Sequence, residues 1–257
     1  MAKYPVPSVS VIINGDDLGM NSDVNDAIFD LLATDQITST TVLANGPRVQ
    51  EAAARIHCFP RSSFGAHLNL TEFEPLTRGF GQHRSTIRAL RTEGSIMRLA
   101  LKPLVLRAVY EEWCCQLDRL GSLGFTVSHI DSHHHIHTAP SLLPALKAVQ
   151  HRYRIRKVRI SRNIYAAGCD PARLLVIGKQ IFNCALRRIY ATRTTDAFTD
   201  FVTFCRKVSS DSRSSCRTIE LSVHPGSAGV NEETQLLQSR WYDTISVPIR
   251  RIAYWQL

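Results

Sequence analysis

The sequence predicts an α/β fold whose strands are mostly parallel and are joined by helical crossovers. Two observations support this prediction. Short β-branched runs alternate with amphipathic helical patterns along most of the 257 residues, and polar side chains follow several of these runs directly. No internal repeat, low-complexity tract or domain boundary interrupts the alternation. We therefore expect a single domain over residues 1–257, with variable insertions near 71–123 and 163–216.

The first half of the chain contains three of the expected strands. Residues 9–14 form a β-branched run that ends in Gly-Asp-Asp, which is typical of a buried parallel strand that meets a loop. Asn21 or Ser22 can cap the helix that follows, and Pro47 can start the next one. The pattern predicts strands over 9–14, 37–44 and 64–70, helices over 22–32 and 48–56, a loop over 71–95, and one or two helices over 96–123 with a break at Lys102-Pro103.

The second half continues the alternation. A helix over 174–190 would be amphipathic and would end in the basic pair Arg187-Arg188, whereas the rest of 163–216 is the least regular part of the chain. The pattern predicts strands over 124–130, 157–161 and 218–223, and helices over 140–150, 174–190 and 231–240.

The net charge of +9 is concentrated in two stretches, which favours an anionic partner such as a membrane surface or a phosphorylated substrate. A solvated basic face is the simpler explanation. No zinc-finger spacing, RNP-like aromatic motif or basic zipper accompanies the charge, so nucleic acid is not expected as a partner. The two stretches comprise Arg84, Arg88, Arg91, Arg98, Lys102 and Arg107, and then Arg152, Arg154, Arg156, Lys157, Arg159 and Arg162.

The cysteines and the N-terminus favour the cytoplasm. The seven cysteines are odd in number and include no CxxC pair, as expected of reduced thiols. The N-terminal apolar run is too short for a signal-peptide core, and no window approaches the ~20 apolar residues that span a bilayer. We expect a cytoplasmic protein, with the inner face of the membrane as a variant of that location.

Residues 128–140 read SHIDSHHHIHTAP and contain five of the ten histidines. Such a cluster is costly to bury unless it binds something. On an extended segment, His133 and His135 would share a side and His134 would point away. We expect His133 to be a ligand with His135 as its neighbour, Asp131 to support them, and His129, His134 and His137 to pack or to face solvent.

Four polar signals fall at the C-terminal ends of expected strands, which is where ligand sites form in parallel α/β folds. Asp17, His67 and one histidine of the cluster would supply the carboxylate and imidazole donors of a catalytic divalent metal. Of the tandem carboxylates, one would bind the metal and the other would act as general base toward a water. The four signals are Asp16-Asp17, His67, the cluster 129–137 and His224.

Each signal also has a simpler explanation. Asp16 and Asp17 could cap the following helix, and His67 could be a half-buried strand histidine. The histidine run could be a surface loop that scavenges metal, and His224 could belong to a plain turn. Because all four signals fall at one edge of the sheet, the sequence favours a metal-dependent catalytic site over these separate explanations.

Several motifs together resemble the YdjC-like carbohydrate deacetylase family, which includes chitooligosaccharide deacetylases. The order and spacing fit over residues 9–147 and again over 218–241, whereas 71–123 and 163–216 match weakly. Gly15 and Leu18 stand where the family usually has Ala and Phe. The motifs are NGDDLGMNSDVNDAI, TSTTVLANGP, GAHLNLTEFEPL, HIDSHHHIH and HPG.

The resemblance implies a distorted (β/α) barrel of the polysaccharide-deacetylase kind and a divalent metal, Mg or Zn. By position, Asp17, His67 and His133 match the family's metal ligands, and Asp16 matches its catalytic base. His224 is similar in position to a histidine near the scissile amide. Arg159 resembles an arginine that holds the acid/base network.

The leading hypothesis is thus a metal-dependent hydrolase that removes an N-acetyl group from an amino sugar. The basic stretches and the amphipathic 174–190 helix suggest a variant in which the sugar is linked to a lipid or diphosphate carrier at the membrane. The partners considered also include a second copy of the chain, as a homodimer. Two alternatives remain: a metal-dependent phosphoesterase, which would need a two-metal site with carboxylates such as Asp131 and Glu220, and a non-catalytic metal- or sugar-binding protein.

Overall fold

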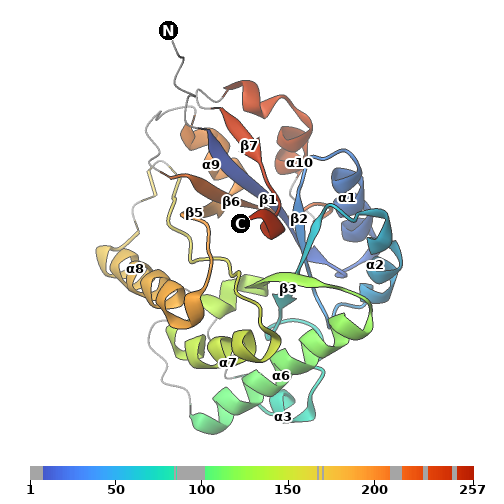
Figure 1. The fold of residues 1–257 in the computed structure, drawn as a ribbon, viewed down its shortest axis with the longest axis vertical. Coiled ribbons are helices and arrows are strands. Elements are labelled where there is room, and N and C mark those ends of the chain that lie inside the picture. Colours follow the sequence, from blue (N-terminus) through green and yellow to red (C-terminus); the bar gives the residue numbers. More distant parts are fainter. Residues whose placement is uncertain are drawn as a thin grey trace.

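The computed structural model describes residues 8–83, 85, 102–166, 168–169, 171–208, 216–227, 231–244 and 248–257. Its centre is a parallel sheet with the strand order β4-β3-β2-β1-β6-β5, in which β7 also pairs with β1 (Figure 1). The strands are β1 (Val9–Leu18), β2 (Ser39–Val42), β3 (Ser63–Leu68), β4 (Val127–Ser132), β5 (Ala197–Asp200), β6 (Thr218–Val223) and β7 (Ile249–Arg251).

The segment 157–163 joins the two outer strands of this sheet. On one side, the backbone amide of Arg159 donates to the carbonyl of Ile130 in β4 at 3.0 Å. On the other side, the Val158 amide donates to the Arg193 carbonyl at 3.1 Å, and the Asn163 amide donates to the Phe198 carbonyl of β5 at 3.3 Å. The strands therefore curve into a distorted (β/α) barrel, as the family resemblance implied.

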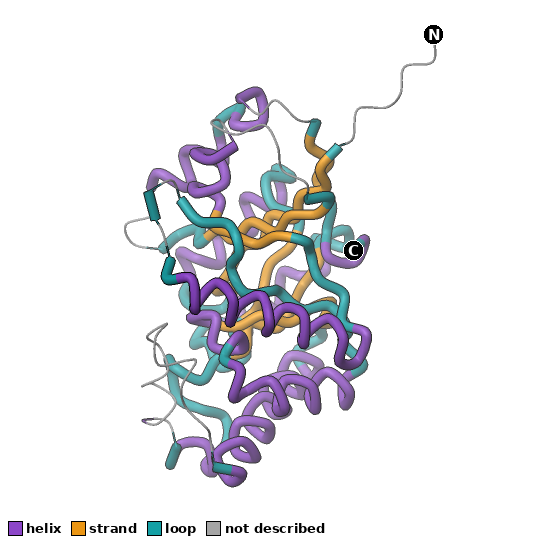
Figure 2. Tube along the Cα trace, turned by 90° about the vertical axis from the view of Figure 1, so that its left-hand side faces the viewer, coloured by secondary structure: helices purple, strands orange, loops and turns teal. Residues whose placement is uncertain are grey.

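The helices cover the outside of the barrel (Figures 1 and 2). The Asn21 side chain caps α1 by accepting a hydrogen bond from the Val24 amide at 2.8 Å, as expected. The main helices are α1 (Ser22–Ala33), α2 (Val49–Arg55), α3 (Arg78–Gly81), α6 (Pro103–Ser122), α7 (Leu143–Tyr153), α8 (Arg173–Arg188), α9 (Phe201–Val208) and α10 (Asn231–Gln238).

Alternation along β1 separates an apolar outer layer from a polar barrel interior. Gly15 faces the helices, because a Cβ added there would lie 3.0 Å from Ile37 and 3.4 Å from Ile28. Asn14 and Asp16, two residues apart, are buried on the opposite side. Ile12 clusters with Ile252 and Tyr254, which close the end of the barrel away from the carboxyl ends of the strands.

The sequence placed most of these elements correctly. The expected strand over 218–223 is β6. The helices expected over 22–32 and 48–56 are α1 and α2, whose bounds differ by one residue at most at either end. The pattern missed β5 and α9, which lie in the segment that looked least regular, and also β7 and α3, the last within the expected loop over 71–95. The expected strand over 157–161 is wrong, since this segment forms only isolated bridges at Lys157 and Val158. The predicted start of a helix over 96–101 and most of the first basic stretch lie outside the described residues.

Two further expectations concern the cysteines and the membrane. All seven cysteines have free thiols, as expected. Among the helices that the structure describes, none combines the length and the apolar character needed to cross a bilayer.

Gly65 in β3 faces the barrel interior, where a Cβ would lie 2.5 Å from the ring of His129. We expect Gly65→Ala to lower the free energy of unfolding by about 1–3 kcal/mol, because the buried ring must shift in a packed interior. Urea unfolding measures this change. Gly121→Ala near the end of α6 is the matched control, because no atom lies within 4 Å of its added Cβ. A Gly65→Ala protein as stable as the control would contradict the packing described here.

Candidate metal and catalytic site

Two consecutive carboxylates, Asp16 and Asp17, reach the same site because β1 is irregular at this point. The register of β1 against β2 shifts between Gly15 and Leu18, and Asp17 has a φ of 72°, in the left-handed region. A regular strand would send neighbouring side chains to opposite faces. Such a conformation costs a non-glycine residue about 1–3 kcal/mol, and residues held in it cluster at functional sites.

His67 connects Asp17 to the neighbouring strand. Its Nε2 lies 3.2 Å from Asp17 Oδ1, and its Nδ1 lies 2.7 Å from Asp131 Oδ1. His67 and Asp131 are register partners on β3 and β4, which explains their proximity. Burial opposes protonation of His67, but Asp131 and Asp17 raise its pKa to about 10. Burial likewise opposes the charge of Asp17, yet its hydrogen bonds to His133 and His67 hold its pKa well below the usual range.

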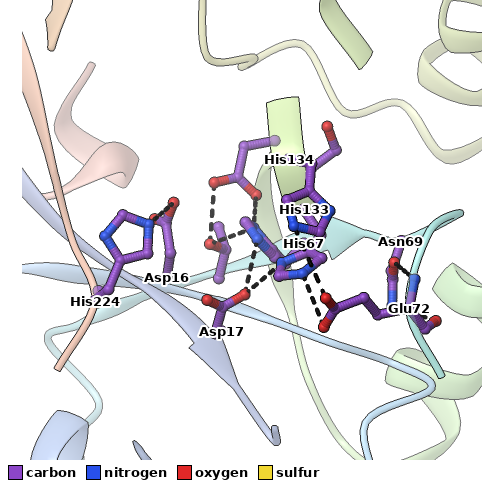
Figure 3. Close-up of polar contacts among 12 residues, drawn as sticks. Asp16, Asp17, His67, Asn69, Glu72, His133, His134 and His224 are labelled. Carbon is purple, nitrogen blue, oxygen red and sulfur yellow. Dashed lines mark hydrogen bonds and ion pairs between the residues drawn. The ribbon is translucent and has the colours of Figure 1, made fainter. Parts of the chain in front are cut away.

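His133 adds a second imidazole to Asp17. Its Nδ1 lies 2.8 Å from Asp17 Oδ1, and its Nε2 lies 3.2 Å from Glu72 Oε2 (Figure 3). His133 begins a 3-10 segment, His133–Thr138, rather than an extended one. His134 and His135 both have a φ of 53°.

The left-handed turn makes one expectation about the histidine run wrong. His135 does not share a side with His133 but packs edge-on against Phe198 at 5.4 Å between ring centroids. His134 stays beside His133, with ring centroids 4.0 Å apart, and its Nδ1 is hydrogen-bonded to the Thr71 hydroxyl at 2.8 Å. His129 and His137 are buried, as expected, and burial lowers their pKa values to about 3 and about 4.

Arg159 lies inside the barrel and binds three carboxylates. It donates two hydrogen bonds of 2.7 Å to Asp16, through NH1 to Oδ2 and through NH2 to Oδ1. NH1 also lies 2.7 Å from Asp131 Oδ2, and Nε donates to Glu220 Oε1 at 2.7 Å. Burial disfavours the guanidinium charge, but the three carboxylates raise the pKa of Arg159 well above its ordinary value.

One oxygen of the Asp16 carboxylate can accept a further hydrogen bond. Oδ1 accepts hydrogen bonds from Arg159 and, at 2.8 Å, from the side-chain amide of Asn14. Oδ2 accepts from Arg159 and lies 3.8 Å from Nε2 of His224, whose side chain is 38% exposed. His224 follows β6, and its backbone amide donates to Glu233 Oε1. The partly open side of Asp16 thus faces His224.

The donors around Asp17 fit a divalent cation. One ligand atom each from Asp17, His67 and His133 lies within 4.8 Å of the others, and all three residues are buried. Because His67 Nδ1 is directed at Asp131, its Nε2 is left to face Asp17, which is the usual orientation of a metal-binding histidine with a carboxylate behind it. A carboxylate with two imidazoles is a common donor set for a catalytic divalent metal.

Sequence reasoning missed several residues of the site. Glu72 reaches His133 and His134, and the Thr41 hydroxyl bridges Asp131 and His67 at 3.0 and 3.1 Å. Tyr254 donates to Glu220 and stacks on His129 at 3.6 Å between centroids. The signal for Glu72 was its place just after the strand of His67, but Glu74 shares that place.

Comparison with known proteins decides the family. Residues 10–246 match the sequence model described as YdjC-like protein. The chain belongs to the YdjC-like family. The motifs that carried the resemblance contain Asp16, Asp17, His67, His133 and His224, which the fold brings to one edge of the barrel.

Two relatives of this YdjC-like chain are named carbohydrate deacetylase. The protein from Vibrio campbellii is 34% identical over 152 residues, which is 57% of each chain. The one from Geobacillus stearothermophilus is 35% identical over 156 residues, 59% of this chain and 60% of the relative. The matches thus span about 57–60% of the relatives' length.

A solved structure from Enterococcus faecalis V583 shares the YdjC-like chain's fold. Its name refers to cleavage of cellobiose-phosphate. The two chains superpose with a TM-score of 0.69 at 22% sequence identity, over 96% of this chain and 98% of the other. This likeness supports the barrel architecture.

Arg159→Met should destabilise the protein by about 3–5 kcal/mol, because it leaves three buried carboxylates without their cation. Urea unfolding at neutral pH measures the loss. The exposed pair of Arg206 and Glu232, 2.6 Å apart, provides the control. There Arg206→Gln should cost less than about 1 kcal/mol. Equal effects of the two substitutions would show that the buried network contributes no more than a surface pair.

Proposed function

We propose that this YdjC-like protein is a metal-dependent carbohydrate N-deacetylase that hydrolyses the N-acetyl group of an amino sugar. The observation that carries the proposal is the convergence of Asp17, His67 and His133 beside a second carboxylate, Asp16, which a buried arginine orients. The names of the relatives support the choice of substrate class. We place the protein in the cytoplasm as a single domain.

Asp17, His67 and His133 would hold a divalent cation, Mg or Zn. When bound, such a cation supplies Lewis acidity toward a water and toward the acyl oxygen of the substrate. Asp16 takes the proton of the attacking water at Oδ2, the oxygen with spare capacity. Arg159 fixes the plane of the Asp16 carboxylate through two hydrogen bonds.

His224 completes the proton transfers from the open side of the site. Hydrolysis forms a bond between the water oxygen and the acyl carbon and breaks the bond from that carbon to nitrogen. The leaving amine therefore needs a proton, and His224 as an imidazolium, with its Nε2 3.8 Å from Asp16 Oδ2, would donate it. The same charge would stabilise an oxyanion that forms on that side.

The alternatives are less well supported by the contacts. A two-metal phosphoesterase needs carboxylates that bridge two cations, but the candidates Asp131 and Glu220 are each bonded to Arg159. A non-catalytic binding protein would have no need of an oriented base. The sugar itself is either a free oligosaccharide or one linked to a lipid carrier, and a substrate panel must include both.

Acetate release from N-acetylated oligosaccharides and glycolipids tests the activity. We expect release that chelator abolishes and added divalent metal restores. Asp16→Asn should lower kcat by about 10²–10⁴-fold, because it removes the general base, and should leave the bound metal in place. Absence of acetate release from every substrate with metal-loaded wild-type protein would favour the binding-protein alternative.

Metal affinity tests the assignment of Asp17 as a ligand and of Asp131 as the support of His67. We expect Asp17→Asn to weaken binding of divalent metal by at least about 100-fold, and Asp131→Asn, which acts through His67, to weaken it by about 10–100-fold. Isothermal titration calorimetry of the chelator-treated proteins with divalent metal measures both affinities. Glu232→Gln, on the exposed surface, is the control. Unchanged metal affinity in Asp17→Asn would overturn the ligand assignment even if the protein proved to be a deacetylase.

A further inference from the structure

Helix α8 exposes an apolar stripe that packing against the barrel does not require. Its inner face is buried through Phe182, Asn183 and Leu186. On the opposite face, Leu174, Ile177 and Ile181 are 81%, 49% and 65% exposed. These positions recur at intervals of three and four residues, so they line up along one side of the helix. A surface helix ordinarily presents polar residues on this side.

The charges of α8 are all of one sign. The helix contains no acidic residue, and three of its four basic residues, Arg173, Arg187 and Arg188, lie at its two ends. The exposed Arg173 precedes Leu174, and the exposed Arg187 and Arg188 follow Ile181 after about two turns. An apolar stripe flanked by arginines has the chemistry of a helix that lies in the interface of an anionic lipid bilayer.

The stripe begins near the N-terminal end of α8 and ends at Ile181, just past the middle of the helix. Asn183, in the C-terminal half, lies beside Ser161, since its Oδ1 accepts from the Ser161 amide at 2.9 Å. Ser161 follows the extended segment that carries Arg159, at the carboxyl-end edge of the barrel. Because α8 leads from this edge back to the start of β5, its earlier residues extend beyond Ser161. Leu174 lies roughly 13 Å along the helix from Asn183. Figure 2 shows α8 running along the outside of the barrel, across the face turned to the viewer.

We propose that α8 docks the protein on an anionic lipid surface, with Leu174, Ile177 and Ile181 inserted among the lipids and Arg173, Arg187 and Arg188 at the headgroups. The net charge of +9 attracts the protein to such a surface at longer range. Docking in this way would hold the opening beside Asp16 and His224 next to the membrane. The proposal rests on α8 alone and does not depend on the deacetylase activity.

A second copy of the chain fits the stripe less well. A two-fold axis brings the same patch of both copies together. In a parallel pairing Arg173 would meet Arg173, and in an antiparallel pairing Arg173 would meet Arg187 and Arg188. Both arrangements place like charges together with no acidic residue on either helix to compensate them.

Vesicle flotation of the full-length protein tests the proposal. We expect the protein to float with vesicles of phosphatidylcholine and phosphatidylglycerol at least about tenfold more than with phosphatidylcholine alone, and high salt should reduce this binding. Replacing Leu174, Ile177 and Ile181 together by Ser should lower the binding by at least about tenfold, because three apolar insertions are lost.

Leu104→Ser is the matched control, since Leu104 is 72% exposed but lies on α6. It should leave vesicle binding unchanged, and thermal unfolding should show both variants to be folded. Arg173→Gln with Arg188→Gln should weaken binding to the anionic vesicles only. The proposal is overturned if wild-type protein does not float, if the control loses as much binding as the stripe variant, or if sedimentation shows a dimer that the stripe substitutions dissociate.

Discussion

The buried ion pairs of Arg159 are the interaction on which the rest of the structure depends. The guanidinium comes from the extended segment after α7, and its three carboxylate partners come from β1, β4 and β6. A fully buried charge is costly unless it is paired and hydrogen-bonded, and here every partner is itself a buried carboxylate. The contact therefore fixes the relative positions of four segments of the barrel, and it fixes them at the edge where the candidate site forms.

This arrangement gives two adjacent aspartates different chemistry. Asp16 faces the arginine, whereas the left-handed conformation of Asp17 turns it toward His67 and His133. The negative charge of Asp17 and Asp131 that raises the pKa of His67 is also the charge that a divalent cation would meet. One Asp-Asp pair can thus supply an oriented base and a metal ligand, because its surroundings separate the two roles.

The sequence predicted the position of site residues where a polar side chain follows a strongly apolar strand. Asp16, His67 and His224 were placed at one edge because parallel strands share their carboxyl-end edge. Strands β5 and β7 have only 4 and 3 residues, too few for alternation to show. The turn at His134 and His135 depends on backbone angles that no periodicity reports. Glu72 and Thr41 reach the site through tertiary contacts, and the position of Glu72 after the strand of His67 does not distinguish it from Glu74.

Helix α8 connects the buried network to the outer surface. Its Asn183 makes two hydrogen bonds to the backbone of Ser161, two residues from Arg159, so the helix cannot shift without disturbing the segment that carries the arginine. The outer face makes no comparable contact with the barrel, because Leu174, Ile177 and Ile181 are 81%, 49% and 65% exposed. The proposed lipid contact would account for their apolar character. Since the inner face is fixed to Ser161, whatever binds the outer face is held at a constant distance from Asp16.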